Sequence, residues 1–178
     1  IKYRLEIPPG PWGTILLDPA WPWTTRGPKR PLIYDRMSLE DIQTINPTQY
    51  LSEVGHLWCW TTNAHLHVCL DMLRNWGLTY RSTVTWGKNR IGLGFLIRGQ
   101  TEHLIWATRP NIKRFTKPGA TSTLIKAPTS KHSKKPDRAY EIIQALSPGP
   151  YLELFARQER EGWTTLISDT PPPTPFQS

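Results

Sequence analysis

The segment Asp18-Pro19-Ala20-Trp21 contains residue types that could act on an amino group attached to an aromatic ring. Such an amino group is a poor nucleophile because its lone pair is delocalised into the ring. The Asp18 carboxylate and the Pro19 carbonyl could accept its two protons and so localise the lone pair. Pro19 would stiffen the turn, and Trp21 offers a flat surface for a base removed from its stack. The alternative interpretation is a strand-ending aspartate beside a core tryptophan, and the four residues alone leave both open.

Basic residues are concentrated in one part of the chain. The 178 residues have a net charge of +8. Residues 81–135 contain twelve Lys and Arg but one acidic residue, Glu102, a net charge of +11, and the remaining residues carry −3. Such a segment is typical of a protein that binds the phosphates of a nucleic acid; a solvated basic surface without a partner is the alternative. The residues expected to contact phosphate are Lys88, Arg90, Arg98, Lys113, Arg114 and Lys117.

Several other classes of protein are disfavoured. No run of 18 apolar residues is present, so we expect no membrane span, and the start of the chain does not resemble a signal peptide. Cys59 and Cys69 form neither a disulfide framework nor a metal site. His65 and His67 are two residues apart and would not share a helix face, so no metal is expected. Phosphate-loop and dinucleotide glycine motifs are missing from the sequence. A reducing, cytoplasmic setting is expected.

Short apolar runs alternate with helical segments along the chain. The pattern predicts six strands, at residues 12–17, 57–62, 80–86, 102–108, 151–155 and 163–167. Helices are predicted after Ser38, over residues 64–76 with Asn63 as the cap, and over residues 137–146 with Pro136 in the first turn. Residues 110–131 form a long polar segment of the kind that is usually functional or disordered. We expect a single domain over residues 1–170 and a proline-rich tail over residues 171–178.

This alternation predicts an α/β fold, with a mainly parallel sheet covered by helices on both faces. Ligands of such sheets bind at the carboxyl ends of the strands. Asp18 follows the first predicted strand, and residues 153–157 lie around the end of the fifth. The sequence therefore predicts that these two groups of residues lie near the same ligand.

The motifs resemble those of the MT-A seventy-kilodalton family of adenine methyltransferases, in the family's order, from about residue 14 to residue 169. The family's Asp-Pro-Pro-Trp motif is matched by residues 18–21, with Ala20 in place of the second proline. Tyr34 begins a segment that resembles the family's Tyr-Gly-Thr-Met-Ser, in which the tyrosine flanks the target base. Arg98 to Glu102 fits an Arg-x-x-x-Glu pattern of prokaryotic members. The resemblance implies that residues 18–21 are catalytic and that Tyr34 contacts the substrate; we also assign Trp86 to the substrate site.

The resemblance places the cofactor half in the C-terminal third. Residues 133–136 resemble the family's Ser-His-Lys-Pro, whose lysine contacts the methionine carboxylate of S-adenosylmethionine. Residues 147–149 and 153–157 resemble Ser-Pro-Gly and Glu-Leu-Phe-Gly-Arg, and an acid at a strand end can accept both ribose hydroxyls. Residues 168–169 fall where the family places an amide pair that reads the cofactor adenine. The implied cofactor-binding residues are Ser133, Lys135, Glu153, Phe155, Arg157, Ser168 and Asp169.

The resemblance implies a Rossmann-like, S-adenosylmethionine-dependent fold with the circularly permuted motif order. The implied reaction is methylation of the exocyclic amino group of adenine. We expect DNA as the substrate, because no recognition domain is appended, as in small prokaryotic and phage members, which act near the nucleoid. RNA is the alternative. A catalytically silent nucleic-acid-binding subunit is a third hypothesis, which the presence of Asp18 and Trp21 disfavours. A homodimer or heterodimer would be consistent with the family, whose members often work as pairs.

Overall fold

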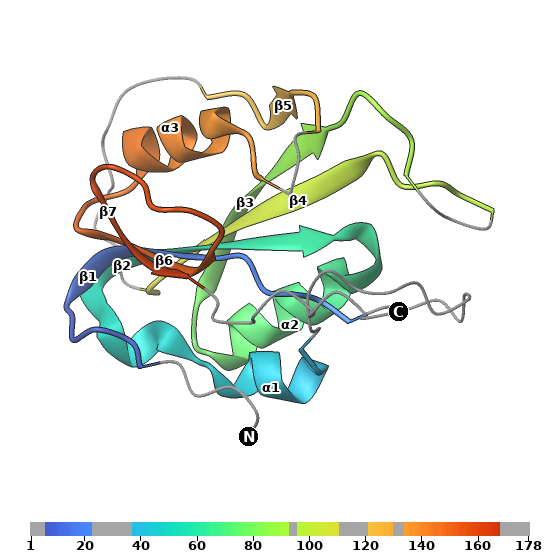
Figure 1. Cartoon of the computed structure of the whole chain (residues 1–178). Helices are drawn as coiled ribbons and strands as arrows, with labels where there is room; N and C mark the ends of the chain where they lie inside the picture. The colour runs from blue at the N-terminus through green and yellow to red at the C-terminus, as the bar shows by residue number, and fades with distance from the viewer. Residues whose placement is uncertain (1–5, 23–36, 93–95, 111–120, 130–133, 168–178) are drawn as a thin grey trace, which may run out of the picture.

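The computed structural model describes residues 6–22, 37–92, 96–110, 121–129 and 134–167, which form an α/β structure built on one seven-stranded sheet (Figure 1). The strands are β1 (Trp12–Leu17), β2 (Leu51–Thr62), β3 (Thr79–Gly87), β4 (Thr101–Thr108), β5 (Leu124–Lys126), β6 (Tyr151–Ala156) and β7 (Trp163–Ile167). The helices are α1 (Leu39–Thr44), α2 (Leu66–Asn75) and α3 (Asp137–Leu146), with short 3-10 turns η1 (Pro47–Tyr50) and η2 (Asn63–His65). Among the described residues, none of the helices has the length and apolar character needed to cross a bilayer.

The strand order is β5-β3-β4-β2-β1-β6-β7, and all the pairings except those of β4 are parallel. β4 runs antiparallel to both β2 and β3. The prediction of a mainly parallel sheet is therefore confirmed, with one reversed strand. Because of this reversal, β4 begins at the edge of the sheet where the other strands end, and Glu102 lies opposite Thr62 and Trp86 there. We call this the carboxyl edge.

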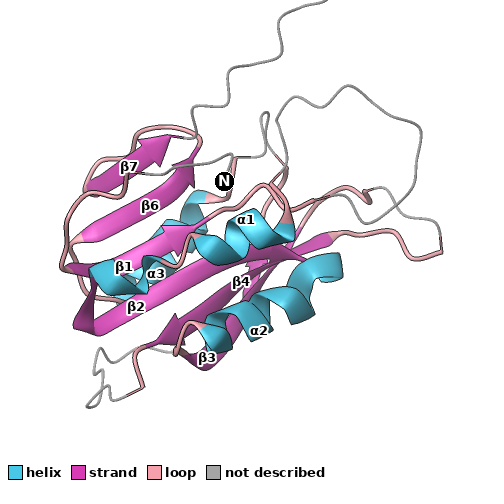
Figure 2. Cartoon of the chain, turned by 90° about the horizontal axis from the view of Figure 1, so that it is seen from below, coloured by secondary structure: helices cyan, strands magenta, loops and turns pink. Residues whose placement is uncertain are grey.

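Helices cover both faces of the sheet, as predicted. Figure 2 shows α1 and α2 on the near face and α3 behind the sheet. Alternate residues of β1 point to opposite faces: Ile15 and Leu17 pack in the cluster that includes α2, whereas Leu16 packs with Ile143 of α3. Burial on both faces explains why β1 is a continuous apolar run rather than an alternating one.

Two helix starts follow from local signals in the sequence. The Ser38 hydroxyl accepts a hydrogen bond from the backbone N–H of Asp41 at 3.0 Å, which confirms the predicted N-cap of α1. Pro136 was predicted in the first turn of α3; it takes the N-cap position instead, and the helix itself begins at Asp137. At the end of α2, Gly77 has a φ of +76°, the left-handed conformation that glycine adopts readily.

Three predictions about the elements were wrong in part. Asn63 does not cap a helix, because its side-chain oxygen, the atom that a cap would use, bonds Nε2 of His103 at 2.8 Å, while its NH₂ group donates to Thr101. The chain makes η2 first, and α2 begins at Leu66. β2 begins at Leu51, six residues before the predicted start. The prediction missed this part of the strand because its first residues are partly exposed and lack an apolar pattern. The polar segment 110–131 contains β5, which is only three residues long. The predicted tail lies outside the described residues.

Ser147, just after α3, should contribute measurably to stability. Its buried hydroxyl accepts the indole N–H of Trp58 and bonds Nδ1 of His56, both at 2.8 Å. Burial, together with Arg81, lowers the pKa of His56 to about 4, so this ring is neutral at physiological pH. Ser147→Ala removes a partner from two buried groups, and we expect it to lower the free energy of unfolding by about 1–3 kcal/mol in urea titrations. Ser82→Ala, at a half-buried serine in β3, should change it by less than about 0.5 kcal/mol. Equal effects of the two substitutions would contradict this account.

Candidate active site

Asp18 lies at the carboxyl edge, immediately after the central strand β1. Its backbone N–H donates to the carbonyl of Leu154 at 3.3 Å, which extends the pairing of β1 with β6 by one residue. The Asp18 side chain is buried. The backbone of this residue is therefore held by the sheet itself, which fixes where its carboxylate can point.

The residues that follow Asp18 form a tight turn that Trp21 anchors. The N–H of Trp21 donates to the Pro19 carbonyl at 2.9 Å, so the turn closes even with Ala20 in the third position. A carbonyl has two lone pairs, and that of Pro19 can accept a second hydrogen bond. The Trp21 indole donates to the carbonyl of Trp60 at 2.8 Å and stacks on His65 with 5.2 Å between ring centroids. These contacts tie the turn to the end of β2.

The predicted role of Trp21 as an open surface for a base requires correction. Only 5% of Trp21 is exposed, and the indole belongs to the core cluster on the α1 and α2 face. Its hydrogen bond and its stacking partner give it an anchoring role in this structure. The hydrogen-bond acceptors predicted at Asp18 and Pro19 do not depend on this correction.

Four charged side chains form a continuous series of ion pairs beside the turn. The ammonium of Lys135, the residue two positions before α3, lies 2.9 Å from Asp18 Oδ1 and 3.2 Å from Glu102 Oε2. Glu102, at the start of β4, also pairs with Lys88, just after β3. The Lys135 ammonium lies 5.3 Å from the ring centroid of Trp60, a further favourable contact for a cation. We call these four residues (Asp18, Lys135, Glu102 and Lys88) the charge series.

The electrostatics of the charge series keep its central pair ionised. Burial alone would lower the pKa of Lys135, but the carboxylates of Asp18 and Glu102 outweigh it and raise that pKa above its usual value. Burial alone would raise the pKa of Glu102, but Lys135 and Lys88 lower it below its usual range. Lys135 and Glu102 are therefore both charged at neutral pH. Such a pair is costly to desolvate and tolerates little change in geometry.

A second carboxylate, Glu153 of β6, lies at the same edge but differs in its surroundings. Its Oε1 accepts a hydrogen bond from the Tyr140 hydroxyl of α3 at 2.9 Å. Burial raises the pKa of Glu153 to about 7, an effect that the Tyr140 hydrogen bond opposes. The Arg160 guanidinium lies 3.5 Å from the Tyr140 ring centroid and holds the ring from the other side. A buried glutamate whose pKa lies near 7 is a candidate for a binding site. In its ionised form, it can accept hydrogen bonds from hydroxyl groups such as those of a ribose.

The backbone near Glu153 is strained in a way that suits a binding site. Phe155 has a φ of +65°, which is rare for an aromatic residue. The pairing of β6 with β7 shifts its register across this residue, between Leu154 and Ala156. Strain of this kind is found mostly where a ligand or a reaction requires it. Glu153 therefore supplies a hydrogen-bond acceptor beside a strained stretch of backbone, and Lys135 supplies a cation at the carboxyl edge.

The structure separates the predicted substrate residues into three groups. Lys88 is committed to Glu102 rather than free for phosphate, and Trp86 is a core residue, 3% exposed, whose indole donates to the Ala127 carbonyl at 2.8 Å; both assignments require correction. Arg90 and Arg98 are exposed between β3 and β4, where phosphate could reach them. The other predicted substrate residues lie outside the described part of the chain: Tyr34, Lys113, Arg114 and Lys117. The same holds for three predicted cofactor residues: Ser133, Ser168 and Asp169.

Sequence reasoning gave Glu102 and Tyr140 no role. Tyr140 follows Lys135 by more than one helical turn and has no motif of its own. Glu102 could have been found, because it is the one acidic residue in the strongly basic segment 81–135. An isolated acid among many bases is well placed to pair with them, and here it pairs with Lys88 and Lys135.

Removing the charge of Lys135 should lower the free energy of unfolding, because the other members of the charge series depend on this cation. We expect Lys135→Met to lower the free energy of unfolding by about 3 kcal/mol, because Asp18 is left as a buried charge without this cation. Adding Asp18→Asn should restore part of that loss. Lys134→Met is the matched control: Lys134 is more exposed and pairs with Asp137 at 3.6 Å, so its loss should cost less than about 0.5 kcal/mol. The measurement is urea unfolding of these three variants and of Asp18→Asn alone; additive losses in the double variant would contradict the pairing.

Comparisons with known proteins agree with the geometry. The MT-A70 family model matches residues 12–168. An MT-A70-like putative N(6)-adenosine-methyltransferase of Medicago truncatula is 25% identical over 93% of this chain and 27% of its own length. The human N(6)-adenosine-methyltransferase catalytic subunit METTL3 is 27% identical over 88% of this chain and 28% of its own length. The chain thus spans little more than a quarter of these relatives. Since the family match runs from β1 to the end of β7 and includes Asp18, Lys135 and Glu153, the chain belongs to the MT-A70 family.

Proposed function

We propose that this protein transfers a methyl group from S-adenosylmethionine to the exocyclic amino group of adenine in a nucleic acid. The observation that carries the proposal is the position of the Asp18 carboxylate and the Pro19 carbonyl at the carboxyl edge. The Asp18 carboxylate is also in contact with the Lys135 ammonium there. Glu153 lies in the neighbouring strand β6, opposite Leu16, which precedes Asp18 by two residues. Acceptors for an amino group and contacts for a nucleoside cofactor therefore come from adjacent strands.

The chemistry of the site follows from what these residues can accept. S-adenosylmethionine would supply a methyl group bound to a positively charged sulfur. Asp18 and the Pro19 carbonyl accept the two protons of the adenine amino group, which directs its lone pair at the methyl carbon. The nitrogen would gain a bond to the methyl carbon as the carbon–sulfur bond breaks, with the electron pair of that bond remaining on the sulfur of the departing S-adenosylhomocysteine. The nitrogen would also lose one of its protons, which the Asp18 carboxylate could accept. Preorganisation of both acceptors by the sheet and the turn means that they need not reorient during the reaction.

The cofactor contacts are proposed from charge and hydrogen-bonding capacity. Glu153, in its ionised form, would accept the ribose hydroxyls, and Lys135 would attract the methionine carboxylate. The strained backbone of Phe155 would line the same nucleoside. Arg157, two residues further along the chain, would line it as well. Ser133, Ser168 and Asp169 remain proposed contacts on the strength of the family resemblance.

The relatives favour RNA over the DNA that the sequence first indicated. The human and Medicago relatives are named as N(6)-adenosine methyltransferases, and adenosine is the ribonucleoside. We therefore propose RNA as the first substrate to test and DNA as the second. Arg90 and Arg98 are exposed candidates for phosphate contact, joined by Tyr34, Lys113 and Arg114 as proposed contacts. The human relative is named a catalytic subunit, which supports the proposal that this chain works with a second protein or a second copy. A cytoplasmic or nucleoid-associated location is also proposed.

Asp18→Asn should abolish methylation while leaving the cofactor site in place. The amide keeps the shape of the side chain but loses the charge and one acceptor, and we expect methyl transfer to fall by about 100-fold or more. The measurement is N6-methyladenine formed in matched RNA and DNA oligonucleotides, by mass spectrometry, with cofactor affinity measured in parallel. Asp71→Asn, at an exposed aspartate of α2, is the control and should change neither quantity.

Two outcomes would count against the proposed function. Full activity of Asp18→Asn would remove Asp18 from the reaction. Nucleic-acid binding without cofactor binding or methylation in the unaltered chain would favour the silent-subunit hypothesis instead.

The pH dependence of cofactor binding should report on Glu153. Because its pKa is raised to about 7, the carboxylate that accepts ribose hydroxyls is scarce below that pH and abundant above it. We expect the affinity for S-adenosylmethionine to rise about tenfold between about pH 6 and about pH 8, as the ionised fraction does. Glu153→Gln cannot ionise and should lose this rise. Calorimetric titration of both proteins checks this, and the same pH dependence in the variant would contradict the assignment.

A further inference from the structure

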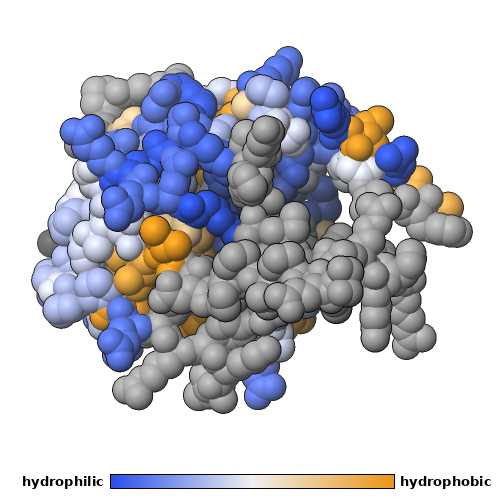
Figure 3. Space-filling view, viewed as in Figure 1, coloured by the Kyte–Doolittle hydropathy of each residue, from blue (hydrophilic) through white to orange (hydrophobic). Residues whose placement is uncertain are grey.

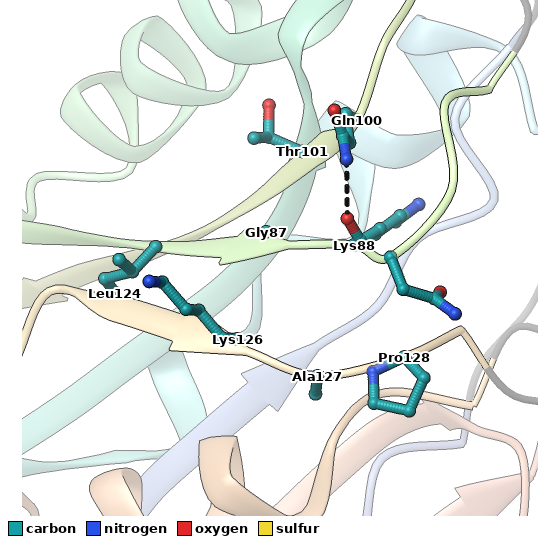
Figure 4. Close-up of a pocket in the computed structure, with 9 residues that line it drawn as sticks. Gly87, Lys88, Gln100, Thr101, Leu124, Lys126, Ala127 and Pro128 are labelled. Atoms are coloured by element: carbon teal, nitrogen blue, oxygen red, sulfur yellow. Dashed lines mark hydrogen bonds between the residues drawn. The ribbon is translucent and has the colours of Figure 1, made fainter.

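A cavity of about 470 Å³ lies at the carboxyl edge, on the β3, β4 and β5 side of the charge series (Figure 4). Three segments form it: the end of β3, the residues before and at the start of β4, and β5 with the residues after it. Its volume is within the range of small-molecule and nucleotide sites. The lining residues are Gly87, Lys88, Asn89, Gln100, Thr101, Leu124, Lys126, Ala127 and Pro128.

The cavity is continuous with the catalytic machinery. Lys88 lines it and pairs with Glu102, which in turn pairs with Lys135 and so connects to Asp18. Gln100 fixes the backbone at the same place, because its amide donates to the Lys88 carbonyl at 2.9 Å. A chain of nucleotides that places one adenine at Asp18 would therefore pass close to this cavity.

The walls of the cavity are suited to a flat ring. Gly87 contributes no side chain; a Cβ there would meet Leu124 and the Ile125 carbonyl at 3.8 Å, an ordinary van der Waals contact, so a Cβ can be added at this position without a clash. Leu124 is 47% exposed, on a surface around β5 that is mostly hydrophilic (Figure 3). Together with Ala127 and Pro128, it gives the cavity an apolar side.

The rim of the cavity carries groups that match a nucleotide. Lys126 is exposed and cationic, and it follows Leu124 by two residues, on the same side of β5. Asn89 uses its side-chain oxygen to accept the backbone N–H of Thr129 at 3.0 Å, which leaves its NH₂ group as a donor for a base edge or a phosphate. An apolar slot with a cation and an amide at its rim combines the features used to hold single-stranded nucleic acid.

We propose that this cavity binds the nucleotide next to the target adenine on the same strand, with its base against Gly87 and Leu124 and its phosphate near Lys126. The inference rests on the proposed function and deepens it, because the cavity would set which sequences around adenine are methylated. The occupant is a nucleotide of the substrate rather than a protein segment, since the cavity is linked to Asp18 through the charge series and all of its lining residues belong to the basic segment 81–135.

The test uses single-stranded RNA oligonucleotides with one adenine, in which each neighbouring nucleotide is replaced in turn by an abasic one. For the unaltered protein, we expect the abasic replacement at one neighbouring position to lower kcat/KM for methylation by about fivefold or more, the usual effect of losing a stacked base. Gly87→Val fills the slot with a residue that strands tolerate, and Lys126→Ala removes the cation. In Gly87→Val, the intact RNA should react more slowly by a similar factor, and the abasic replacement should have no further effect.

Controls separate this inference from loss of folding and from failure of the proposed function. Arg74→Ala, an exposed cation at the end of α2, should behave like the unaltered protein, and cofactor binding should persist in every variant. If Gly87→Val does not fold, Lys126→Ala still tests the rim through weaker binding of intact RNA by fluorescence anisotropy. Methylation with the same abasic penalty in the Gly87→Val variant, or RNA binding unchanged in Lys126→Ala, overturns the cavity proposal alone. RNA binding that depends on Gly87 and Lys126 without any methylation overturns the proposed reaction and retains the cavity.

Discussion

The ammonium of Lys135, between the buried carboxylate of Asp18 and the half-buried carboxylate of Glu102, is the interaction on which the carboxyl edge depends. It joins the end of β1, the start of β4 and the segment before α3, which are far apart in the sequence. Without this cation, Asp18 and Glu102 would be neighbouring like charges in a poorly solvated place, where repulsion is stronger than in water. The charge series therefore explains how an aspartate can stay buried at the edge of a hydrophobic sheet.

The reversal of β4 makes this arrangement possible. In a sheet with every strand parallel, the end of β4 would lie at the carboxyl edge, and Glu102 would be at the opposite edge. Running antiparallel, β4 brings Glu102 opposite Thr62 and Trp86, within reach of Lys88 and Lys135. The same reversal helps to form the cavity, because it places Gln100 and Thr101 beside the end of β3, whose other side pairs with β5. One antiparallel strand thus supplies both the acid of the charge series and a wall of the neighbouring pocket.

What could be predicted from the sequence depended on how local each signal was. The apolar run of β1, the Ser38 cap and the helix α3 follow from contiguous residues and were predicted with nearly correct bounds. Asn63 has the chemistry of a cap, but His103 competes for its side-chain oxygen, and only the tertiary structure decides between the two partners. β5 is too short to show a pattern. Trp86 and Trp21 are aromatic residues beside a site, and nothing in the sequence distinguishes a stacking surface from a core side chain in such a place.

The candidate site shows the same division. Asp18, Lys135 and Glu153 were predicted from motifs, and the structure brings them to one edge of the sheet. Their partners Glu102 and Tyr140 come from other elements, and pairing across elements cannot be inferred from spacing. Lys88 illustrates the opposite error, since a lysine in a basic segment was expected to contact phosphate but is committed to Glu102.

The position of Lys135 has a consequence for how two ligands would influence one another. The Lys135 ammonium pairs with the Asp18 carboxylate and also lies where we propose that the cofactor's carboxylate binds. A ligand that attracts this ammonium would therefore change how strongly Lys135 holds Asp18. Such a shared ion is a thermodynamic coupling between two binding equilibria, and couplings of this kind are reciprocal. Whatever factor the cofactor contributes to the affinity for adenine, adenine must contribute to the affinity for the cofactor. A single lysine would then make the two halves of the site respond as one unit.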